Sequence, residues 1–337
     1  MGAMATWLPI VWAGLIGTAV AMYVILDGFD LGIGILYPLN KDEQDRHVMM
    51  NSVAPFWDGN ETWLILGVGG LFVAFPLAYG IIIPALYLPI IIMLLALVFR
   101  GVAFEFRWVA KPDHQFWDLA FAGGSITAAF AQGLVLGGLL EGITVKDNAF
   151  AGGTFDWLTP FSVVTAIAVV AGYALLGSTW LVMRTEGPAA IRAREHAKLL
   201  LLFVMAAMVL ISLWTPLAVD HIFERWFTLP NLFYLAPIPL LATIAAVLCW
   251  WSLHTEREVM PFLLSVALFL LGYIRLAVSN LPLMVQPTLS IWDVSAAPSS
   301  QLFMLVDTAI MLPVILGYTV FVYWTFRGKV RPGEGYH

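Results

Sequence analysis

Acidic side chains within apolar stretches are the residues of this 337-residue chain best suited to chemistry. Asp27 and Asp30 lie three residues apart near the end of the first apolar stretch. A helix there would carry both carboxylates on one face. Asp58 and Glu61 repeat the spacing at the start of the next stretch. Because a carboxylate within a bilayer is costly, it is expected to face a cavity, a partner or a proton path.

Basic residues accompany this acidic pattern. Arg100 ends the third apolar stretch and is followed by Glu105 and Arg107. At 1.5 Å per residue, Asp27 lies about 30 Å from the outer end of its helix, close to the boundary where Asp58 begins the second helix. We expect three helices to bring these groups to one cytoplasmic region. The alternative is that they are interfacial residues in contact with water, which applies most to Glu105 and Arg107.

Arg275 is the only basic residue deep within an apolar stretch. We expect it to pair with a carboxylate or with a partner subunit. Asp307, in the last apolar stretch, is either that carboxylate or an interfacial residue.

The histidines do not have the placement that an intramembrane haem requires. A b-type haem needs an axial imidazole at mid-membrane, whereas the six histidines fall in predicted loops, at helix ends or in the tail: His47, His114, His196, His221, His254 and His337. The 13 methionines are expected to pack in apolar helices. The single cysteine, Cys249, excludes an internal disulfide and a multi-thiolate metal centre. We therefore predict that this chain binds no haem and no metal.

Composition assigns the chain to a membrane. It is 61% hydrophobic and 11% charged, whereas soluble domains are roughly 25% charged. One crossing needs about 20 apolar residues, and the apolar runs lack the alternation of a β-barrel. The sequence predicts an all-α, polytopic single domain, 1–337, with about nine transmembrane helices near 7–36, 57–79, 81–100, 117–140, 160–183, 198–219, 233–252, 261–281 and 302–326.

Loop charge predicts the orientation. Cytoplasmic loops carry an excess of Lys and Arg, and only Lys146 and Arg225 fall on the opposite side. The N-terminus should be outside and the C-terminus cytoplasmic. With a net charge of −6 and no basic stretch, nucleic acid is not an expected partner. The predicted cytoplasmic side holds Lys41, Arg46, Arg100, Arg107, Lys111, Arg184, Arg192, Arg194, Lys198, Arg257, Arg327, Lys329 and Arg331.

Two pairs of glycines have the four-residue spacing at which membrane helices approach closely: Gly28 with Gly32, and Gly133 with Gly137. A further glycine group, GVGGLF at 67–72, lies inside an apolar helix with no preceding strand, which argues against a dinucleotide loop.

Four strings in the chain carry a family resemblance: LDGFDLGIG at 26–34, NSVAPFWDGNETW at 51–63, RGVAFEFR at 100–107 and TLSIWDVSAAPSSQL at 288–302. In this order and spacing they resemble subunit II of cytochrome bd-type quinol oxidases. The short connection at 220–232 is similar to the shorter branch of that family, which includes the cyanide-insensitive oxidases.

The resemblance implies a heterodimer in the bacterial inner membrane. Each subunit would have nine helices, arranged as two four-helix bundles and a peripheral helix. Subunit I would carry two b haems, haem d and the quinol-oxidising loop, whereas subunit II would carry no haem. A small single-helix accessory subunit, membrane lipids and a bound quinone are further partners that the resemblance admits.

The same resemblance implies a role for the acidic residues. The complex oxidises quinol in aerobic respiration and takes the protons for water from the cytoplasm. Four residues match positions that line a hydrophilic path toward the haems: Asp27, Asp30, Asp58 and Arg100. Glu61 stands where some members have a neutral amide, and Glu105 is a further candidate. Two alternatives stay open, a proton-coupled transporter and a purely structural partner subunit.

Overall fold

The computed structural model describes residues 2–110, 114–218 and 220–330. Lys111, Arg331 and His337, named above, lie outside this part, and the side chain of His221 is not described either. The elements up to the midpoint of the chain are α1 (Gly2–Leu36), a 3₁₀ turn η1 (Tyr37–Leu39), α2 (Glu43–Asn51), α3 (Trp57–Ala74), α4 (Pro76–Ala85), α5 (Tyr87–Val109), α6 (Gln115–Glu141), β1 (Val145–Lys146) and β2 (Ala149–Phe150).

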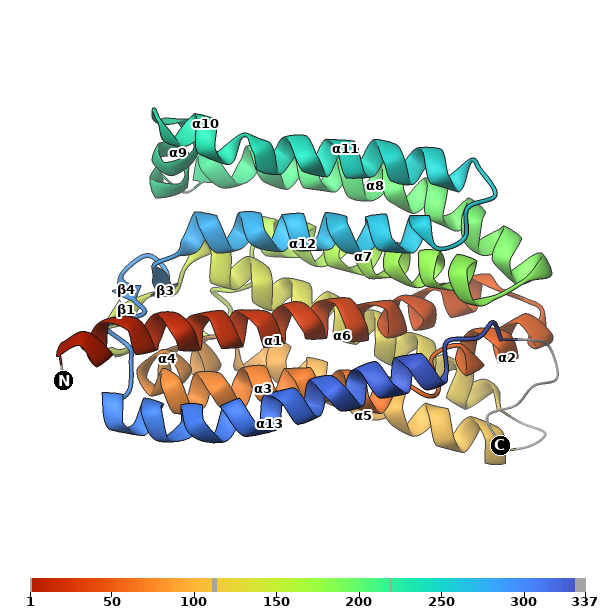
Figure 1. Cartoon of the computed structure of the whole chain (residues 1–337), viewed down its shortest axis with the longest axis horizontal. Coiled ribbons are helices and arrows are strands. Elements are labelled where there is room, and N and C mark those ends of the chain that lie inside the picture. Colours follow the sequence, from red (N-terminus) through yellow and green to blue (C-terminus); the bar gives the residue numbers. More distant parts are fainter. Residues whose placement is uncertain (1, 111–113, 219, 331–337) are drawn as a thin grey trace.

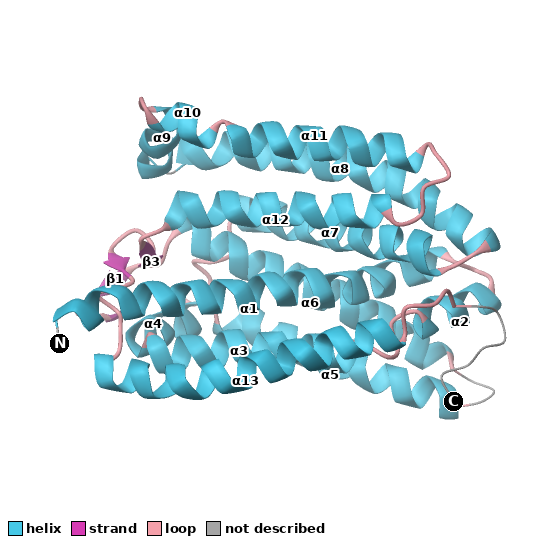
Figure 2. Ribbon diagram, viewed as in Figure 1, coloured by secondary structure: helices cyan, strands magenta, loops and turns pink. Residues whose placement is uncertain are grey.

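The second half repeats the pattern of long helices joined by short connections. Its elements are α7 (Pro160–Arg184), α8 (Gly187–Ala218), α9 (Asp220–Phe227), α10 (Asn231–Leu235), α11 (Pro237–Leu253), α12 (Met260–Asn280), β3 (Leu283–Val285), β4 (Leu289–Ser290) and α13 (Pro298–Thr325). The four strands form two small hairpins at one end of the molecule (Figure 2). The architecture is therefore that of an all-α polytopic membrane protein, as the composition predicts.

The long helices lie roughly parallel in stacked layers (Figure 1). Helices α1, α3, α5 and α6 form one group, in which α1 packs on α3 and α6, and α6 packs on α5. Helices α7, α8, α11 and α12 form a second, closed group, and α13 lies outside along α1 and α3. This arrangement corresponds to the two four-helix bundles and peripheral helix that the resemblance implies.

Eight of the predicted spans correspond to helices that are long and apolar enough to cross a membrane, within the part of the chain that the structure describes. The prediction of about nine spans includes one more, at 57–79. The helix there, α3, is shorter and begins with a polar turn that contains Asp58, Asn60 and Glu61. It lies alongside α1 and α13 (Figure 1), so it remains the candidate for the ninth span.

The region between α3 and α5 differs from the predicted turn at residues 79–80. Helix α3 ends at Ala74, and a separate helix, α4, begins at Pro76. Proline has no N–H to donate and suits the first turn of a helix. The carbonyl of Ala74 accepts hydrogen bonds from the Ala296 amide and from Gln301 Nε2, each at 2.9 Å. Helix α4 ends at Ala85 and α5 begins at Tyr87, so this part of the chain is interrupted twice, at Phe75 and at Leu86.

Two helix boundaries differ from the predicted ones for a shared reason. Helix α5 continues from Arg100 to Val109, where a loop was expected, and α8 begins at Gly187 rather than near residue 198. Both extensions are rich in charged residues, which hydropathy places outside a span. Their backbones nevertheless continue the helices, because polar residues are compatible with a helix that extends beyond an apolar layer.

The motif near the end of the chain organises the end of the bundle that carries the hairpins. Trp292 Nε1 donates to the Thr6 carbonyl at 3.0 Å. The Asp293 carboxylate accepts from the amide and hydroxyl of Ser290, at 2.8 and 2.6 Å, and these bonds hold the pKa of Asp293 below its usual value. Together with Gln301, these residues connect the second half of the chain to α1 and α3.

The predicted glycine pairs make close contacts inside this chain. A Cβ at Gly32 would lie 1.9 Å from the carbonyl oxygen of Tyr173, and one at Gly133 would lie 2.3 Å from Ala166 Cα. Gly28 adjoins the ring of Tyr173, and Gly137 adjoins Ser162. Helices α1 and α6 therefore both approach α7 at glycines, which joins the two bundles.

We expect Gly32→Ala to destabilise the folded chain by about 1–3 kcal/mol, because the added methyl group must displace the backbone of α7. The matched control is Gly14→Ala on the same helix, where a Cβ meets nothing within 4 Å. That change should be neutral or stabilising by about 0.5–1 kcal/mol, since alanine favours a helix. Thermal unfolding in detergent measures both. Equal unfolding temperatures for the two variants would contradict the close contact.

Candidate functional site

Arg100 lies at the centre of a buried cluster of ionisable groups. It is fully buried on α5, and its guanidinium bridges two carboxylates from different helices. Nη2 pairs with Asp27 Oδ1 of α1, and Nη1 donates to Glu61 Oε1 of α3 at 2.6 Å. The structure thus brings together the three helices that the acidic pattern indicated.

Asp30 belongs to the same cluster but has a neutral partner. It is fully buried, and its Oδ2 accepts a hydrogen bond from Asn60 Nδ2 at 2.7 Å. Asn60 is held in turn, because its Oδ1 accepts from the Tyr323 hydroxyl at 3.0 Å. Helix α13 therefore contributes to the site through one tyrosine, although it lies outside both bundles.

The cluster contains more carboxylates than cations. Asp27, Asp30 and Glu61 would together carry three negative charges against the single positive charge of Arg100. Uncompensated charge is costly in a low-dielectric interior. In addition, Asp27 Oδ2 and Asp30 Oδ1 are buried without a hydrogen-bond partner among the described atoms. The site therefore has both the electrostatic reason and the free acceptor atoms to bind protons.

Aromatic rings fix the position of the guanidinium. Trp57 and Phe104 stack with their ring centroids 5.1 Å apart, and Arg100 Cζ lies 5.8 and 5.9 Å from those two centroids. A guanidinium over an aromatic face is attracted to it. This contact leaves the Arg100 nitrogens directed at carboxylates.

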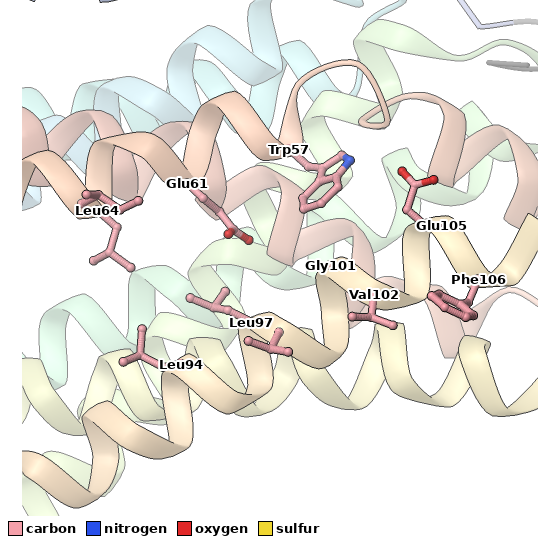
Figure 3. A pocket seen from close by; sticks show the side chains of 11 residues that line it. Trp57, Glu61, Leu64, Leu94, Leu97, Gly101, Val102, Glu105 and Phe106 are labelled. Atoms are coloured by element: carbon pink, nitrogen blue, oxygen red, sulfur yellow. The ribbon is translucent and has the colours of Figure 1, made fainter.

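A groove between α3 and α5 leads to the cluster. It has a volume of about 530 Å³ and is lined mostly by apolar side chains, with Glu61 and Glu105 as its carboxylates. Figure 3 shows Glu61 extending from α3 into this space and Glu105 near its far end. The Glu61 side chain is 27% exposed, whereas that of Arg100 is fully buried. Glu61 thus connects the accessible groove with the buried ion pair.

The remaining predicted site residues lie outside the cluster. Asp58 is exposed in the first turn of α3, where a helix N-terminus favours its charge. Glu105 is exposed at the groove. These positions fit the interfacial alternative for both residues, and they also place both at the surface from which Glu61 is reached.

Arg107 contradicts the interfacial alternative. Its side chain is 1% exposed, and its Nε donates to Asp118 Oδ1 at 2.5 Å. It also pairs with Glu43 of α2. Arg107 was expected in a loop, but it is buried because α5 continues past it and packs on α6.

This second cluster has the residue types of a metal site but not the charge. Glu43, His114 and Asp118 offer ligand atoms that all lie within 4.8 Å of one another. However, Arg107 binds both carboxylates, and Arg46 Nη1 lies 3.2 Å from Asp118 Oδ2. Two guanidinium groups already neutralise the two carboxylates, so a divalent cation would find no net negative charge to bind. The cluster is best described as an ion-pair network that ties α2 to α5 and α6.

Arg275 does not pair with Asp307. Its Nη1 donates to Ser212 Oγ at 2.5 Å, and its guanidinium lies over the ring of Trp226. Asp307 is exposed on α13, and within the described side chains no ion pair joins it to Arg275. Of the two alternatives for Asp307, the pair with Arg275 is therefore wrong, and the exposure of Asp307 fits an interfacial residue.

Sequence reasoning missed the neutral members of the site. Besides Asn60 and Tyr323 these are Tyr23, Gln132 and Tyr173, which are joined by hydrogen bonds from Gln132 Nε2 to the Tyr23 hydroxyl and from the Tyr173 hydroxyl to Gln132 Oε1. Asn60 lies within the NSVAPFWDGNETW string, and Tyr23 is one helical turn from Asp27, so both carried a spacing signal. Gln132 was also detectable, as a polar residue in a helix of small and apolar residues. Tyr173 and Tyr323 gave no signal, because tyrosines are common in membrane helices.

We expect Arg100→Met to destabilise the protein by about 3–5 kcal/mol, because it leaves the buried Asp27 carboxylate without its cation. The double variant Arg100→Met with Asp27→Asn should recover much of that loss. The control is Arg327→Met, an exposed residue just after α13, expected to change stability by no more than about 0.5 kcal/mol. Thermal unfolding tests the cycle, and strictly additive effects of the two substitutions would contradict the pair.

Comparisons with known proteins show the family of the chain. The family model for cytochrome bd terminal oxidase subunit II matches residues 8–326. The cytochrome bd-I ubiquinol oxidase subunit 2 of Escherichia coli K12 is 27% identical, over 96% of this chain and 95% of its own. The cytochrome bd ubiquinol oxidase subunit 2 of Bacillus subtilis is 28% identical, over 96% and 97%. A chain of the bd oxidase from Geobacillus thermodenitrificans has the same fold, with a TM-score of 0.74, 16% identity and coverage of 95% and 98%. The chain belongs to the cytochrome bd terminal oxidase subunit II family.

Proposed function

We propose that this chain is the haem-free subunit of a cytochrome bd-type quinol oxidase and that it supplies protons for the reduction of O₂ to water. It would pair with a haem-bearing subunit I in the bacterial inner membrane. Two relatives are named as ubiquinol oxidase subunits, which supports the activity of the complex. The observation that carries the proton-supply role is the buried cluster of Asp27, Asp30 and Glu61 around one arginine.

The placement of the histidines supports the division of labour between subunits. The described histidines lie at or near helix ends: His47 in α2, His114 before α6, His196 in the first turns of α8 and His254 after α11. None of these lies at the middle of a span, where an axial ligand would be needed. Haems held by subunit I would supply the electron transfer and the O₂ chemistry.

The order of the acidic residues suggests the direction of proton transfer. Asp58 and Glu105 are exposed, Glu61 is partly exposed in the groove, and Asp27 is fully buried. A proton would be taken up at the surface, held at a Glu61 carboxylate oxygen and passed on to Asp27 Oδ2. Arg100 stays charged because its guanidinium does not deprotonate in proteins, so it positions Glu61 and Asp27 without carrying the proton.

The charge distribution supports a cytoplasmic entrance. Helix ends that carry Arg107, Arg184, Arg192 and Lys198 gather at the end of the bundle that also holds α2 and the end of α13 (Figure 1). By the excess of Lys and Arg on cytoplasmic loops, this end would be cytoplasmic. The acidic cluster lies toward the same end, so it would draw protons from the cytoplasm.

Of the two alternatives, the transporter has less support. Transporters of this kind bind substrate at broken helices near mid-membrane. Here the interruption at Phe75 lies about 20 Å from Glu61 at 1.5 Å per residue, at the other end of α3. The structural alternative, in which the cluster only stabilises the fold, is tested directly by activity measurements.

We expect Asp27→Asn to lower quinol oxidase turnover and proton uptake of the intact complex by about 10²-fold, the scale on which a positioned proton carrier acts. Asp58→Asn should have a smaller effect, because Asp58 is exposed and water can replace it. Both variants should keep all haem bands, since an amide preserves the shape of the carboxyl. The measurement is O₂ consumption and proton uptake at matched haem content.

The structural alternative makes a different prediction for the same variants. It predicts loss of haem together with activity, because the contact with subunit I would be disturbed. Wild-type rates of turnover and proton uptake in Asp27→Asn would rule out the relay.

We expect the chain produced without subunit I to bind no haem. The reduced-minus-oxidised absorption spectrum of the purified chain measures this directly. The intact complex, prepared in the same detergent, serves as the positive control. A b- or d-type band at one haem per chain would show that the division of labour is wrong.

A further inference from the structure

A chain of neutral side chains leads away from Asp27 into the contact between the two bundles. Tyr173 of α7 donates its hydroxyl proton to Gln132 Oε1 at 2.6 Å, and Gln132 Nε2 donates to the Tyr23 hydroxyl oxygen at 2.7 Å. Tyr23 and Tyr173 are almost fully buried. Tyr23 precedes Asp27 by four residues on α1, so the two side chains share a helix face.

At the Asp27 end of this row of side chains, one hydrogen-bond donor is missing. Asp27 Oδ1 binds Arg100, but Asp27 Oδ2 is a buried acceptor without a hydrogen bond. The Tyr23 hydroxyl is a close neighbour of the Asp27 carboxylate. A hydroxyl has one proton to donate and turns to suit its surroundings. Because Tyr23 already accepts from Gln132, its own proton is available to Asp27.

The orientation of the Gln132 amide decides whether this donation is possible. The two ends of an amide are assigned from the hydrogen bonds they make. With the amide reversed, Tyr23 would donate its proton to Gln132 Oε1, and Asp27 Oδ2 would receive none. The observed orientation satisfies more groups, because reversal would also leave the buried Tyr173 hydroxyl proton without an acceptor among its described hydrogen bonds.

We propose that Gln132 and Tyr173 are positioning residues that hold the Tyr23 hydroxyl as a donor to Asp27 and thereby stabilise the ionised form of this carboxylate. This inference rests on the proposed proton relay through Asp27 and adds three residues to it. Gln132 passes no proton itself, since an amide neither gains nor loses one readily. Its role is to set the direction of the chain.

Packing supports a dedicated position for Tyr173. The Tyr173 ring lies against Gly28, where a Cβ would come within 2.9 Å of Tyr173 Cε1. The ring also stacks on Phe269, with centroids 6.0 Å apart. The close approach of α1 and α7 at glycines therefore places a tyrosine hydroxyl next to Gln132.

Other charged and titratable groups also act on Asp27, and they stay in place in Tyr23→Phe and in Gln132→Leu. Arg100 favours the ionised form, whereas nearby carboxylates oppose it. These groups come from α5, α3, α1, α7 and α13: Arg100, Glu61, Asp30, Tyr173 and Tyr323. Tyr23→Phe leaves these side chains in place, so a difference in pH response between this variant and the wild type follows from loss of the Tyr23 hydroxyl.

The test is the pH dependence of turnover in the intact complex. Tyr23→Phe removes the donation, so the pH at which turnover is half-maximal should rise by about one unit, the value of one hydrogen bond to a charged group. Gln132→Leu removes the bond that orients the Tyr23 hydroxyl, so it should raise this pH by a smaller amount. Tyr173→Phe should also raise this pH by a smaller amount. It provides the second test if the complex with Gln132→Leu fails to assemble. The control is Tyr273→Phe, which removes a tyrosine hydroxyl of α12 that donates to the Gly17 carbonyl of α1, the helix that carries Tyr23 and Asp27. This change should cause no shift.

Non-additivity separates this role from a general loss of packing. Since Gln132 acts through Tyr23, the double variant Tyr23→Phe with Gln132→Leu should shift the midpoint no further than Tyr23→Phe alone. Additive shifts, no shift in either single variant, or an equal shift in Tyr273→Phe would each overturn the proposal.

A second measurement distinguishes failure of this inference from failure of the relay. Infrared difference spectroscopy follows protonation of the Asp27 carboxyl directly, with the band assigned by its loss in Asp27→Asn. If Asp27→Asn turns over normally, the relay fails, but an infrared midpoint that moves in Tyr23→Phe still supports the hydrogen-bond chain. If the pH midpoint of the Asp27 infrared band is unchanged in Tyr23→Phe, the proposed hydrogen-bond chain is wrong, whatever the turnover rate.

Discussion

A guanidinium without access to water is the constraint around which one half of this molecule is arranged. Arg100 is fully buried, and a buried cation persists only if anions and hydrogen-bond acceptors surround it. Asp27 and Glu61 meet this need from two other helices, and the stacked Trp57 and Phe104 rings lie beside the guanidinium. Helices α1, α3 and α5 therefore have a fixed register relative to one another, although α3 and α5 leave a groove between them.

The second bundle is joined to this arrangement by close backbone contact. Apolar helices gain little from burial when lipid is the alternative environment, so small residues that permit close approach become important. Gly32 of α1 faces the Tyr173 backbone, and Gly133 and Gly137 of α6 face α7. The same contact positions the Tyr173 hydroxyl at Gln132, which extends the polar network from Asp27 across three helices. Packing and chemistry at this junction have a common structural origin.

Two clusters of similar composition are suited to different tasks. Around Arg107 the carboxylates of Glu43 and Asp118 are matched by two arginines, which favours a stable tie between helices. Around Arg100 three carboxylates meet one cation, and two of their oxygens lack a partner. The excess of acid around Arg100 is what a proton-binding site needs, whereas the charges around Arg107 balance.

Much of the fold and part of the site follow from the amino-acid sequence alone. Runs of about 20 apolar residues predict membrane helices because lipid tolerates little else, and eight such helices are present in the described part of the chain. The spacing of Asp27 with Asp30, and the position of Arg100, indicated which helices would meet. Three-dimensional packing decided the rest: it buried Arg107 but left Asp58 exposed, and it recruited Asn60, Gln132, Tyr173 and Tyr323. Sequence spacing reports which residues share a helix face, but a hydrogen bond between helices depends on their rotation and register, which only the packed structure determines.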